Sequence, residues 1–410
     1  MKRDHVLILL IIVALVAAAV VFMSKRDGET AQDASAPRGG SLSLVVIGIE
    51  GFEPELVERF SADGGLPNIS ALMAEGAVGR FASLERGIDS EIPWTSLVTG
   101  MRPENQGIGG TRISPRGEVV PRPLVPEHRT VDTIWTLLSS SGRTVGVIGW
   151  PGAWPVEAVN GVMVGSHSRV ILDQMHNGDV SGRIYPESQQ TVLDAMFASP
   201  SSVRRVDLGR FIDLDTRNPY EALVGQNYTT LATSYAGDAS HTAIALRITA
   251  DPGVESLMVH FLGLDGISQR FWHYMEPERV LGGVTLTDEA REEMLVQAET
   301  LGIVIERYYE YLDEIIGEIL DLATDDATIA VVADHGYKGV ELDWVGNPRL
   351  GTDMHSDRGV WIMKGPSIRP GARVDESESE LFDFAPTLMQ AAGITPAIEL
   401  DGRVLDEVLR

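Results

Sequence analysis

Blocks of apolar positions alternate along most of the chain with blocks of mixed apolar and polar positions. Five apolar runs are too short for stable helices, and several are rich in Val and Ile, so they predict buried strands at residues 42–49, 144–149, 256–262, 328–333 and 359–363. Helical spacing marks the segments between them, at residues 54–61, 68–75, 131–139 and 381–392. This alternation predicts an α/β fold with a largely parallel sheet.

The clearest helical pattern lies just before the fourth predicted strand. Apolar residues recur there at spacings of three and four, at Leu301, Ile305, Tyr308, Leu312, Ile315, Ile319 and Leu322. Such a stripe predicts one long helix that packs against the protein's own sheet. By contrast, residues 166–236 are interrupted by Gly, Asn, Ser and Pro, and are interpreted as an irregular insertion over the sheet.

The N-terminal part has a different composition. Residues 6–23 carry no charge and would span roughly 27 Å as a helix, which is close to the thickness of a bilayer core. They predict an uncleaved membrane anchor, followed by a polar, flexible tether up to residue 40. A cleaved signal peptide is the alternative, because small residues at 17–19 and 33–36 offer cleavage sites. The anchor is favoured because the apolar run is longer than the apolar region of a usual signal peptide.

Both interpretations place the domain at 41–410 outside the cytoplasm. With an uncleaved anchor, the protein would be a single-pass inner-membrane protein with its domain in the periplasm.

Charge and cysteine content narrow the chemistry. The chain has 33 Lys+Arg against 59 Asp+Glu, a formal charge of -26, which argues against a surface that coats nucleic acid. It has no Cys, so disulfides, zinc–thiolate sites, iron–sulfur clusters and a cysteine nucleophile are excluded. A metal site would therefore consist of His and carboxylate ligands.

Acidic residues follow three of the predicted strands, at the edge where an open parallel sheet presents its loops. Glu50 follows the first strand and Asp265 the third, and either alone is compatible with a helix cap or a turn. Asp334, His335 and Gly336 follow the fourth strand. Two adjacent good ligands cannot both be core side chains, and the glycine would let the backbone turn around an ion. This motif therefore predicts a metal site.

Two further segments carry candidate chemistry. Ser90 precedes a predicted short helix, so it is either a plain N-cap or a nucleophile whose pKa a metal lowers. Gln269 stands four residues after Asp265, on the same side of a helix turn, where two ligands could share one metal. Its amide oxygen is a weaker zinc donor than imidazole. His355 lies beyond the Asp-His-Gly motif.

In this order, the segments resemble the type I phosphodiesterase/nucleotide pyrophosphatase family of the alkaline phosphatase superfamily. The similarity extends over nearly all of residues 42–409 and includes "LPNISALMAEGAVG", "WTSLVTGMRPENQGI", "FWHYMEP", "ADHG" and "GVWIMKGPSIRPG". The resemblance implies a three-layer α/β sandwich with an inserted cap region. It also implies a phosphohydrolase with two metals, usually zinc, in which Thr or Ser attacks phosphorus and forms a covalent phosphoenzyme.

Carried over by position, the resemblance implies two metal-ligand sets. The nucleophile of the family stands ten residues before the glycine of the shared Thr-Gly, which here is Ser90 rather than Thr95 or Thr99. One metal would be held by Asp334, His335, Glu50 and Ser90. The other would be held by Asp265, His355 and position 269.

The sequence departs from the family pattern at three positions, two of them in these ligand sets. Glu50 replaces an Asp, Gln269 replaces a metal-ligand His, and Gln106 replaces the His of the family's His-Gly-Ile. His273 lies two helical turns beyond Asp265 and is interpreted as a packing or surface residue rather than a substitute ligand.

Two functions follow from these observations. The first is an exported, membrane-anchored, metal-dependent hydrolase of small phosphate esters. The second is a catalytically degenerate homologue that serves as a binding or scaffold protein at the membrane. A sulfatase is a weaker alternative, because the segment beginning at Ser90 lacks the Cys/Ser-x-Pro-x-Arg context that such enzymes need. A phosphomutase or phosphoglycerol transferase rests on fold alone.

Overall fold

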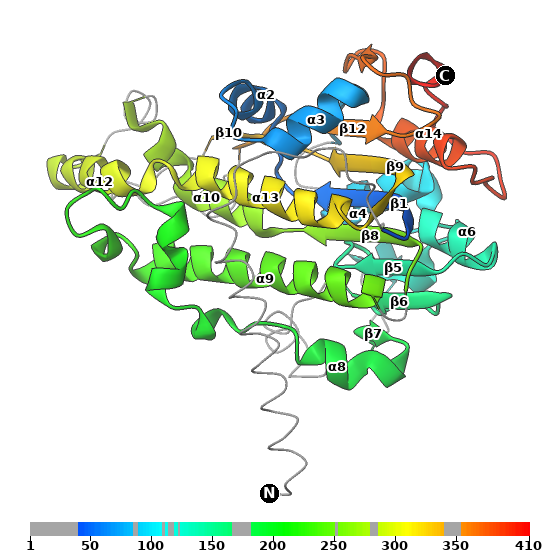
Figure 1. Ribbon diagram of the computed structural model, residues 1–410, viewed down its shortest axis with the longest axis horizontal. Helices are drawn as coiled ribbons and strands as arrows, with labels where there is room; N and C mark the ends of the chain where they lie inside the picture. Colours follow the sequence, from blue (N-terminus) through cyan, green and yellow to red (C-terminus); the bar gives the residue numbers. More distant parts are fainter. Residues whose placement is uncertain are drawn as a thin grey trace, which may run out of the picture. The chain divides into compact units, whose positions relative to one another are not determined.

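The strands form one nine-stranded sheet with β1 at its centre (Figure 1). The computed structural model describes residues 40–84, 89–108, 111–113, 119–121, 124–165, 182–250, 253–278, 286–339 and 354–410. In spatial order the strands are β13 (Arg373–Val374), β2 (Ala77–Ala82), β12 (Arg358–Lys364), β9 (Ala323–Ala333), β1 (Leu42–Ile49), β8 (Ser256–Phe261), β5 (Val145–Ile148), β6 (Gly161–Val164) and β7 (Ile184–Tyr185). All five strands expected from the sequence are present, within a few residues of their predicted ends.

Most of the pairing in this sheet is parallel. β1 pairs in parallel with β8 and β9, β5 pairs in parallel with β6 and β8, and β13 pairs in parallel with β2. Antiparallel pairs involve β12, which lies between β2 and β9, and the edge pair of β6 with β7. The predicted α/β class with a largely parallel sheet is therefore confirmed.

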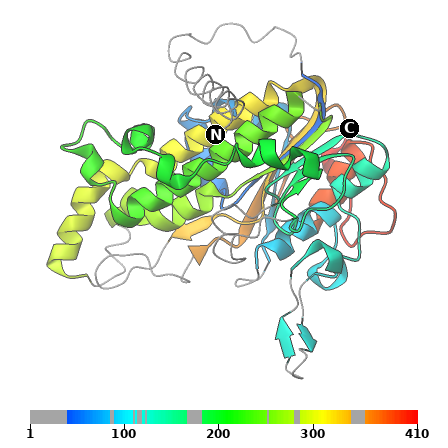
Figure 2. The ribbon, with the colours of Figure 1, turned by 90° about the horizontal axis from the view of Figure 1, so that it is seen from below.

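Helices cover both faces of the sheet, giving three layers (Figures 1 and 2). Successive residues of β1 alternate between two separate hydrophobic cores: Val45, Ile47 and Ile49 face one, whereas Leu44 and Val46 face the other. The first core is packed by α2 (Pro54–Ala62), α3 (Pro67–Glu75), α9 (Gly225–Ala250), α10 (Gly263–Met275), α12 (Asp288–Leu301) and α13 (Val304–Leu320). The second is packed by α4 (Glu91–Thr99), α6 (Ile134–Ser140) and α14 (Phe384–Ala391).

Shorter elements complete the described part of the chain. They are α5 (Pro103–Gln106), α8 (Gln190–Asp194), the two-stranded pairs β3 (Thr111–Ile113) with β4 (Val119–Pro121) and β10 (Tyr337–Gly339) with β11 (Met354–His355), and short 3-10 helices at Pro126–His128, Glu187–Gln189, Pro200–Ser202, Arg205–Phe211, Pro219–Glu221, Leu381–Asp383 and Asp406–Val408.

The long helix predicted over residues 301–322 is shorter than expected. Leu301 ends α12, and α13 begins at Val304 and ends at Leu320, before Leu322. The apolar stripe is nevertheless buried, with Tyr308 and Leu312 fully inaccessible against the sheet. Two helices share one stripe because Gly302 and Ile303 interrupt the helix between the end of α12 and the start of α13.

The expectation of an irregular insertion as far as residue 236 is wrong at its C-terminal end. The 26-residue helix α9 begins at Gly225. Small polar residues conceal this helix in the sequence, because their hydroxyl groups can be buried when they bond back to the preceding turn. Ser240, Thr242 and Thr249 each donate to the carbonyl group four residues earlier. Within 182–224 the chain has only short turns of helix and the brief strand β7, as the irregular pattern predicts.

Two predictions fall on residues that the structure does not describe. The membrane helix at 6–23 and the tether up to residue 40 lie outside the described residues, apart from residue 40 itself, and so does the start of the insertion, 166–181. Among the helices of the described segments, none combines the length and the apolar character needed to cross a bilayer. The division into an anchor at 1–40 and a domain at 41–410 stays a prediction.

Candidate active site

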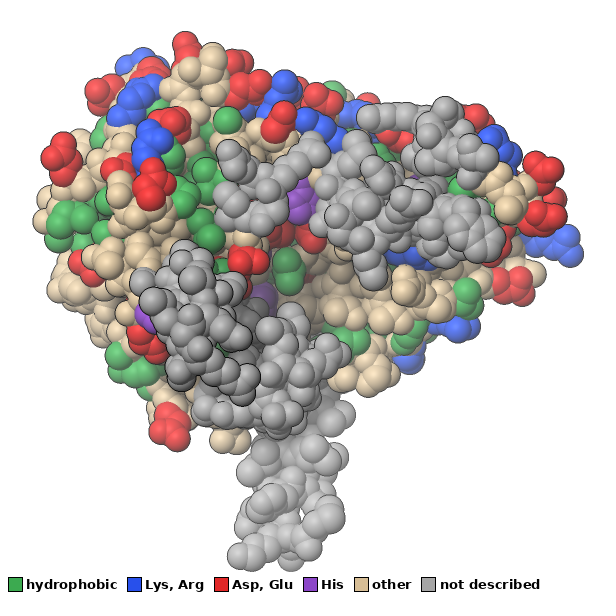
Figure 3. Space-filling view, turned by 180° about the vertical axis from the view of Figure 1, so that it is seen from behind, with side chains coloured by type: hydrophobic (Ala, Val, Ile, Leu, Met, Phe, Trp, Pro, Cys, Tyr) green, Lys and Arg blue, Asp and Glu red, His purple; other side chains and the backbone are tan. Residues whose placement is uncertain are grey.

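The three acidic segments predicted from the sequence meet at one edge of the sheet. Glu50, Asp334 and Asp265 follow β1, β9 and β8, which are adjacent central strands whose carboxyl ends point the same way. Because these strands are parallel, side chains that follow them must come together there. Figure 3 shows a face of the molecule on which histidine side chains lie among acidic ones.

The first group of candidate metal ligands is formed by Glu50, Asp334 and His335, all buried. Their ligand atoms lie within 4.8 Å of one another. His335 Nε2 is 3.3 Å from Glu50 Oε1 and 3.8 Å from Asp334 Oδ1. Its Nδ1 lies 3.1 Å from the carbonyl oxygen of Gly336, which fixes the ring with Nε2 toward the carboxylates.

Ser90 belongs to the same group. It stands at the N-cap position of α4, but its side chain makes no capping hydrogen bond. Instead, Ser90 Oγ donates to Glu50 Oε1 at 2.9 Å. The interpretation of Ser90 as a plain N-cap is therefore wrong. Glu50 is not the cap of the following helix either, since Glu53 fills that position on α2.

The second group is formed by Asp265, His335 and His355. Asp265 lies in the first turn of α10, and His355 Nε2 is 3.6 Å from its Oδ1. His355 reaches this place because β10 and β11 pair, with Tyr337 opposite His355. The rings of His335 and His355 stack with centroids 4.0 Å apart. His335, expected to serve one metal, thus lies between both groups.

Gln269 lies where the spacing predicted. It occupies the same helix as Asp265, α10, one turn further on, and is partly buried. Gln106 is fully buried, and its side chain bonds to α4: its Oε1 accepts from Ser96 Oγ at 3.2 Å, and its Nε2 donates to the Ile92 carbonyl at 3.3 Å. These bonds join α5 to α4. The glutamine that replaces the family's histidine therefore has a structural role.

His273 is a packing residue, as interpreted from the sequence. It is almost completely buried in α10, and its ring lies against Tyr274 with centroids 3.9 Å apart. Burial lowers the pKa of His273 to about 3, because the interior disfavours the imidazolium.

The donor atoms of both groups fit metal ions. Three carboxylate oxygens of these two groups are buried and make no regular hydrogen bond within the described residues: Glu50 Oε2, Asp265 Oδ1 and Asp334 Oδ1. Buried carboxylate oxygens need a partner, and a cation supplies one. Two ligands of one tetrahedral zinc, each about 2.1 Å from the ion, lie about 3.4 Å apart. The histidine–carboxylate distances of 3.3, 3.6 and 3.8 Å are close to that separation.

The electrostatics of the groups show that they attract positive charge. Burial alone would lower the pKa of His335, but the Asp334 and Glu50 carboxylates outweigh it and raise that pKa to about 10. Burial, and next to it the Glu50 charge, raises the pKa of Asp334 to about 7. Burial also opposes ionisation of Glu50, yet His260 and His335 lower its pKa below the ordinary value. A proton on His335 thus takes the place of a cation in the metal-free protein.

One contact of Glu50, with His260, was not predicted from the sequence. His260 Nε2, from the buried strand β8, lies 3.0 Å from Glu50 Oε2. Two features of the sequence point to it. His260 is a polar residue in a largely apolar strand, and it lies two residues after Met258, so both side chains are on the same face of the sheet.

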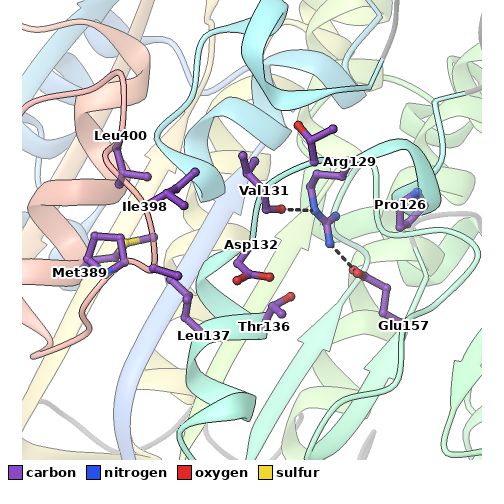
Figure 4. Close-up of a pocket in the computed structure, with 13 residues that line it drawn as sticks. Pro126, Arg129, Val131, Asp132, Thr136, Leu137, Glu157, Met389, Ile398 and Leu400 are labelled. Carbon is purple, nitrogen blue, oxygen red and sulfur yellow. Dashed lines mark hydrogen bonds and ion pairs between the residues drawn. The ribbon is translucent and has the colours of Figure 1, made fainter.

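Among the cavities formed by the described residues, one lies close to the candidate site, although none of the predicted ligands lines it. The cavity of about 300 Å³ is lined by Tyr337 and Ser356, which are neighbours of His335 and His355. The other, of about 260 Å³, lies between residues 126–137 and 389–400 (Figure 4). None of the predicted site residues lines it, and its Arg129 is paired with Glu157. The candidate site is therefore defined by the ligand groups at the carboxyl edge of the sheet rather than by a cavity.

A family comparison decides the assignment. The family model for type I phosphodiesterase / nucleotide pyrophosphatase matches residues 44–381. The chain belongs to this family. The family resemblance expected from the sequence is confirmed. Members of this family are metal-dependent phosphoester hydrolases, in agreement with the enzyme hypothesis.

Solved structures give more distant matches. A mutant of the alkaline phosphatase PafA is 12% identical, with a TM-score of 0.48, covering 92% of this chain and 100% of that one. Human ectonucleotide pyrophosphatase/phosphodiesterase 5 is 11% identical, with a TM-score of 0.46 and coverage of 90% and 100%. The phosphonate monoester hydrolase of Silicibacter pomeroyi is 14% identical, with a TM-score of 0.42 and coverage of 89% and 76%. No curated protein sequence matches the chain. Likenesses this distant carry no information on its substrate.

Proposed function

We propose that this member of the family is a metal-dependent hydrolase of small phosphate esters that acts through a covalent phosphoserine at Ser90. The observation that carries the proposal is the hydrogen bond from Ser90 Oγ to Glu50 Oε1, at 2.9 Å, inside a group of buried carboxylates and histidine. A hydroxyl used as a cap or for packing would not point at a buried carboxylate beside two unpartnered carboxylate oxygens.

The two ligand groups suit zinc. Glu50, Asp334 and His335 with Ser90 would hold one ion, and Asp265 and His355 with Gln269 would hold the other. When bound, such ions supply a Lewis-acid charge that lowers the pKa of the serine hydroxyl and neutralises phosphoryl oxygens. The set contains only carboxylate, imidazole, hydroxyl and amide donors, which zinc accepts and which a chain without Cys must use.

Ser90 and α4 would position the reacting groups. Glu50 holds the hydroxyl proton of Ser90, so that a lone pair of Oγ faces the site. Ser90 immediately precedes the first turn of α4, whose free amide groups are suited to phosphoryl oxygens. Oγ then bonds to phosphorus as the bond to the leaving oxygen breaks, and water hydrolyses the phosphoserine in a second step.

A degenerate homologue that only binds is the second candidate, and Gln269 favours it. An amide in place of imidazole weakens one ligand set and leaves Asp265 and His355 as its strong donors. We favour the hydrolase because Ser90, Glu50, Asp334 and His335 form a complete first group.

Metal analysis and two assays distinguish the candidates. Purified residues 41–410 would be analysed for bound metal and tested with bis-p-nitrophenyl phosphate and p-nitrophenyl phosphate, before and after chelation and readdition of Zn²⁺, Mn²⁺ or Co²⁺. Bound metal and turnover that chelation abolishes support the hydrolase. Absence of turnover with every metal, in both the wild type and Gln269→His, would contradict it and support the binding role.

We also propose that residues 6–23 anchor the protein in the inner membrane, with the catalytic domain in the periplasm. The support is the uncharged apolar length of that segment and the polar stretch that follows it. Fractionation of cells expressing the full chain tests this. Membrane-bound protein that protease digests in spheroplasts supports the anchor, whereas release into the periplasm after removal of the segment supports the signal peptide.

A further inference from the structure

A histidine stands in the middle of the hydrophobic sheet. The strand β8 reads SLMVHF, all six residues are buried, and His260 is only 2% exposed. Burying an imidazole in a sheet costs free energy unless the ring has a polar partner. The polar partner of His260 is Glu50, whose Oε2 lies 3.0 Å from His260 Nε2, off the line of a regular hydrogen bond.

The register of the sheet brings these two residues together. In the parallel pair of β1 and β8, Gly48 lies opposite His260. Glu50 follows two residues after Gly48, on the same face of the sheet. The two oxygens of Glu50 therefore have different neighbours: Oε2 faces His260, whereas Oε1 faces Ser90 and His335.

The imidazole of His260 is held rigidly. Its ring meets Trp94 edge-on, with centroids 4.3 Å apart, and Trp150 lies 6.0 Å away. Gly48 leaves the space for this arrangement, because a Cβ there would lie 2.7 Å from the Trp94 ring and 2.9 Å from His260 Cδ2. Gly48 therefore makes room for both rings, those of Trp94 and His260.

We propose that His260 is a positioning residue for Glu50. His260 contacts Oε2 of Glu50 and so restrains the carboxylate with Oε1 directed at Ser90 and the first ligand group. A glutamate needs such a support more than the aspartate expected at this position, because it has one more rotatable bond and a longer reach. This inference rests on the proposed function, in that Glu50 and Ser90 are taken as parts of the reacting site.

Two substitutions separate this role from simple packing. His260→Phe keeps an aromatic ring of similar size among the tryptophans but removes the nitrogen that faces Glu50. His260→Gln restores a polar donor without the ring. His273→Phe is the matched control, because it replaces another buried imidazole that no carboxylate contacts within the described residues.

The first readout is metal affinity, measured by competition of Zn²⁺ with a chelating dye. Loss of a residue that orients a ligand typically costs about 10- to 100-fold in metal affinity. We expect His260→Phe to weaken the tighter zinc site by that factor and to lower kcat with little change in KM. We expect His260→Gln to recover part of the loss and His273→Phe to bind zinc as the wild type does.

The second readout is independent of metal and of turnover. Crystal structures of the metal-free wild type and of His260→Phe report the Glu50 side chain directly. We expect the hydrogen bond from Ser90 to Glu50 to be present in the first and lost in the second. A folded His260→Phe variant with wild-type zinc affinity and an unchanged Glu50 would overturn the inference. If the wild type binds no zinc, the proposed function fails, and the crystal structures still decide the role of His260.

Discussion

Ser90 and Glu50 are forty residues apart in the chain, and the hydroxyl of the first donates a 2.9 Å hydrogen bond to the carboxylate of the second. Glu50 follows the central strand β1, and Ser90 precedes the first turn of α4, which covers one face of the sheet. The contact joins the candidate nucleophile to the ligand group.

Replacing Ser90 tests its role as nucleophile. Ser90→Ala removes the attacking oxygen, so hydrolysis of a p-nitrophenyl ester should fall by at least about a thousandfold. Ser90→Thr keeps a hydroxyl of the type that the family uses and should keep measurable turnover. Zinc content measured on both proteins is the control, because a loss of metal alone would also lower the rate. Equal turnover by Ser90→Ala and the wild type would exclude Ser90 as the nucleophile.

Gln269 and Gln106 form a matched pair of substitutions. Gln269→His places an imidazole one turn after Asp265, on the same helix, and should tighten the second metal on the order of tenfold or more. Gln106→His should leave metal binding unchanged, because Gln106 is bonded to Ser96 and Ile92 inside α4 and α5. Metal titration of the three proteins measures this. A gain from Gln106→His, or none from Gln269→His, would contradict the assignment.

Metal affinity should rise with pH. In the metal-free protein the pKa of His335 is raised to about 10 and that of Asp334 to about 7. A metal must displace these protons, so acid weakens binding and alkali favours it. Below pH 7 both groups lose a proton on binding, and between pH 7 and 9 only His335 does. The zinc dissociation constant, measured from pH 6 to 8.5 in a non-chelating buffer, should fall by about tenfold per pH unit above pH 7. A dissociation constant that is independent of pH would contradict this protonation state.

Gly336 is required for space rather than for a left-handed turn, since its φ is not positive. A Cβ there would lie 2.2 Å from Glu53 Oε2 and 2.6 Å from Glu53 Cα. Gly336→Ala should therefore lower the free energy of unfolding by about 1–3 kcal/mol and displace His335. Gly237→Ala is the control, because no atom lies within 4 Å of the added carbon in α9. It should leave the protein equally stable or up to about 1 kcal/mol more stable in urea unfolding. The reverse order would contradict the packing described around Gly336.

Much of the fold could be predicted from sequence because its central strands are buried on both faces. The strand β1 is an apolar run apart from the exposed Ser43, and its predicted bounds are those of the structure. The helix α9 escaped prediction because most of its buried residues are small or polar, and only Leu231, Ile244 and Ile248 among them are large and apolar. Such a surface is recognised only when the hydroxyls are seen bonding within the helix.

The candidate site was predictable where neighbouring residues in the sequence also act together. Asp334 and His335 are adjacent, and Asp265 and Gln269 share one helix. The stacking of His335 on His355 depends on the pairing of β10 with β11, which no spacing reveals. The contact between His260 and Glu50 depends on the register between β8 and β1, which the sequence pattern does not reveal.

The central claim is that Ser90 becomes phosphorylated during turnover. Its most direct test is to mix the zinc-loaded domain with a p-nitrophenyl phosphate ester, quench with acid within milliseconds to seconds, digest, and search by mass spectrometry for the phosphorylated peptide. We expect a phosphoryl group on Ser90 that is absent after chelation and absent in Ser90→Ala. A protein that turns over the ester while Ser90 stays unmodified at every quench time, or that carries the phosphoryl group on another residue, would contradict it.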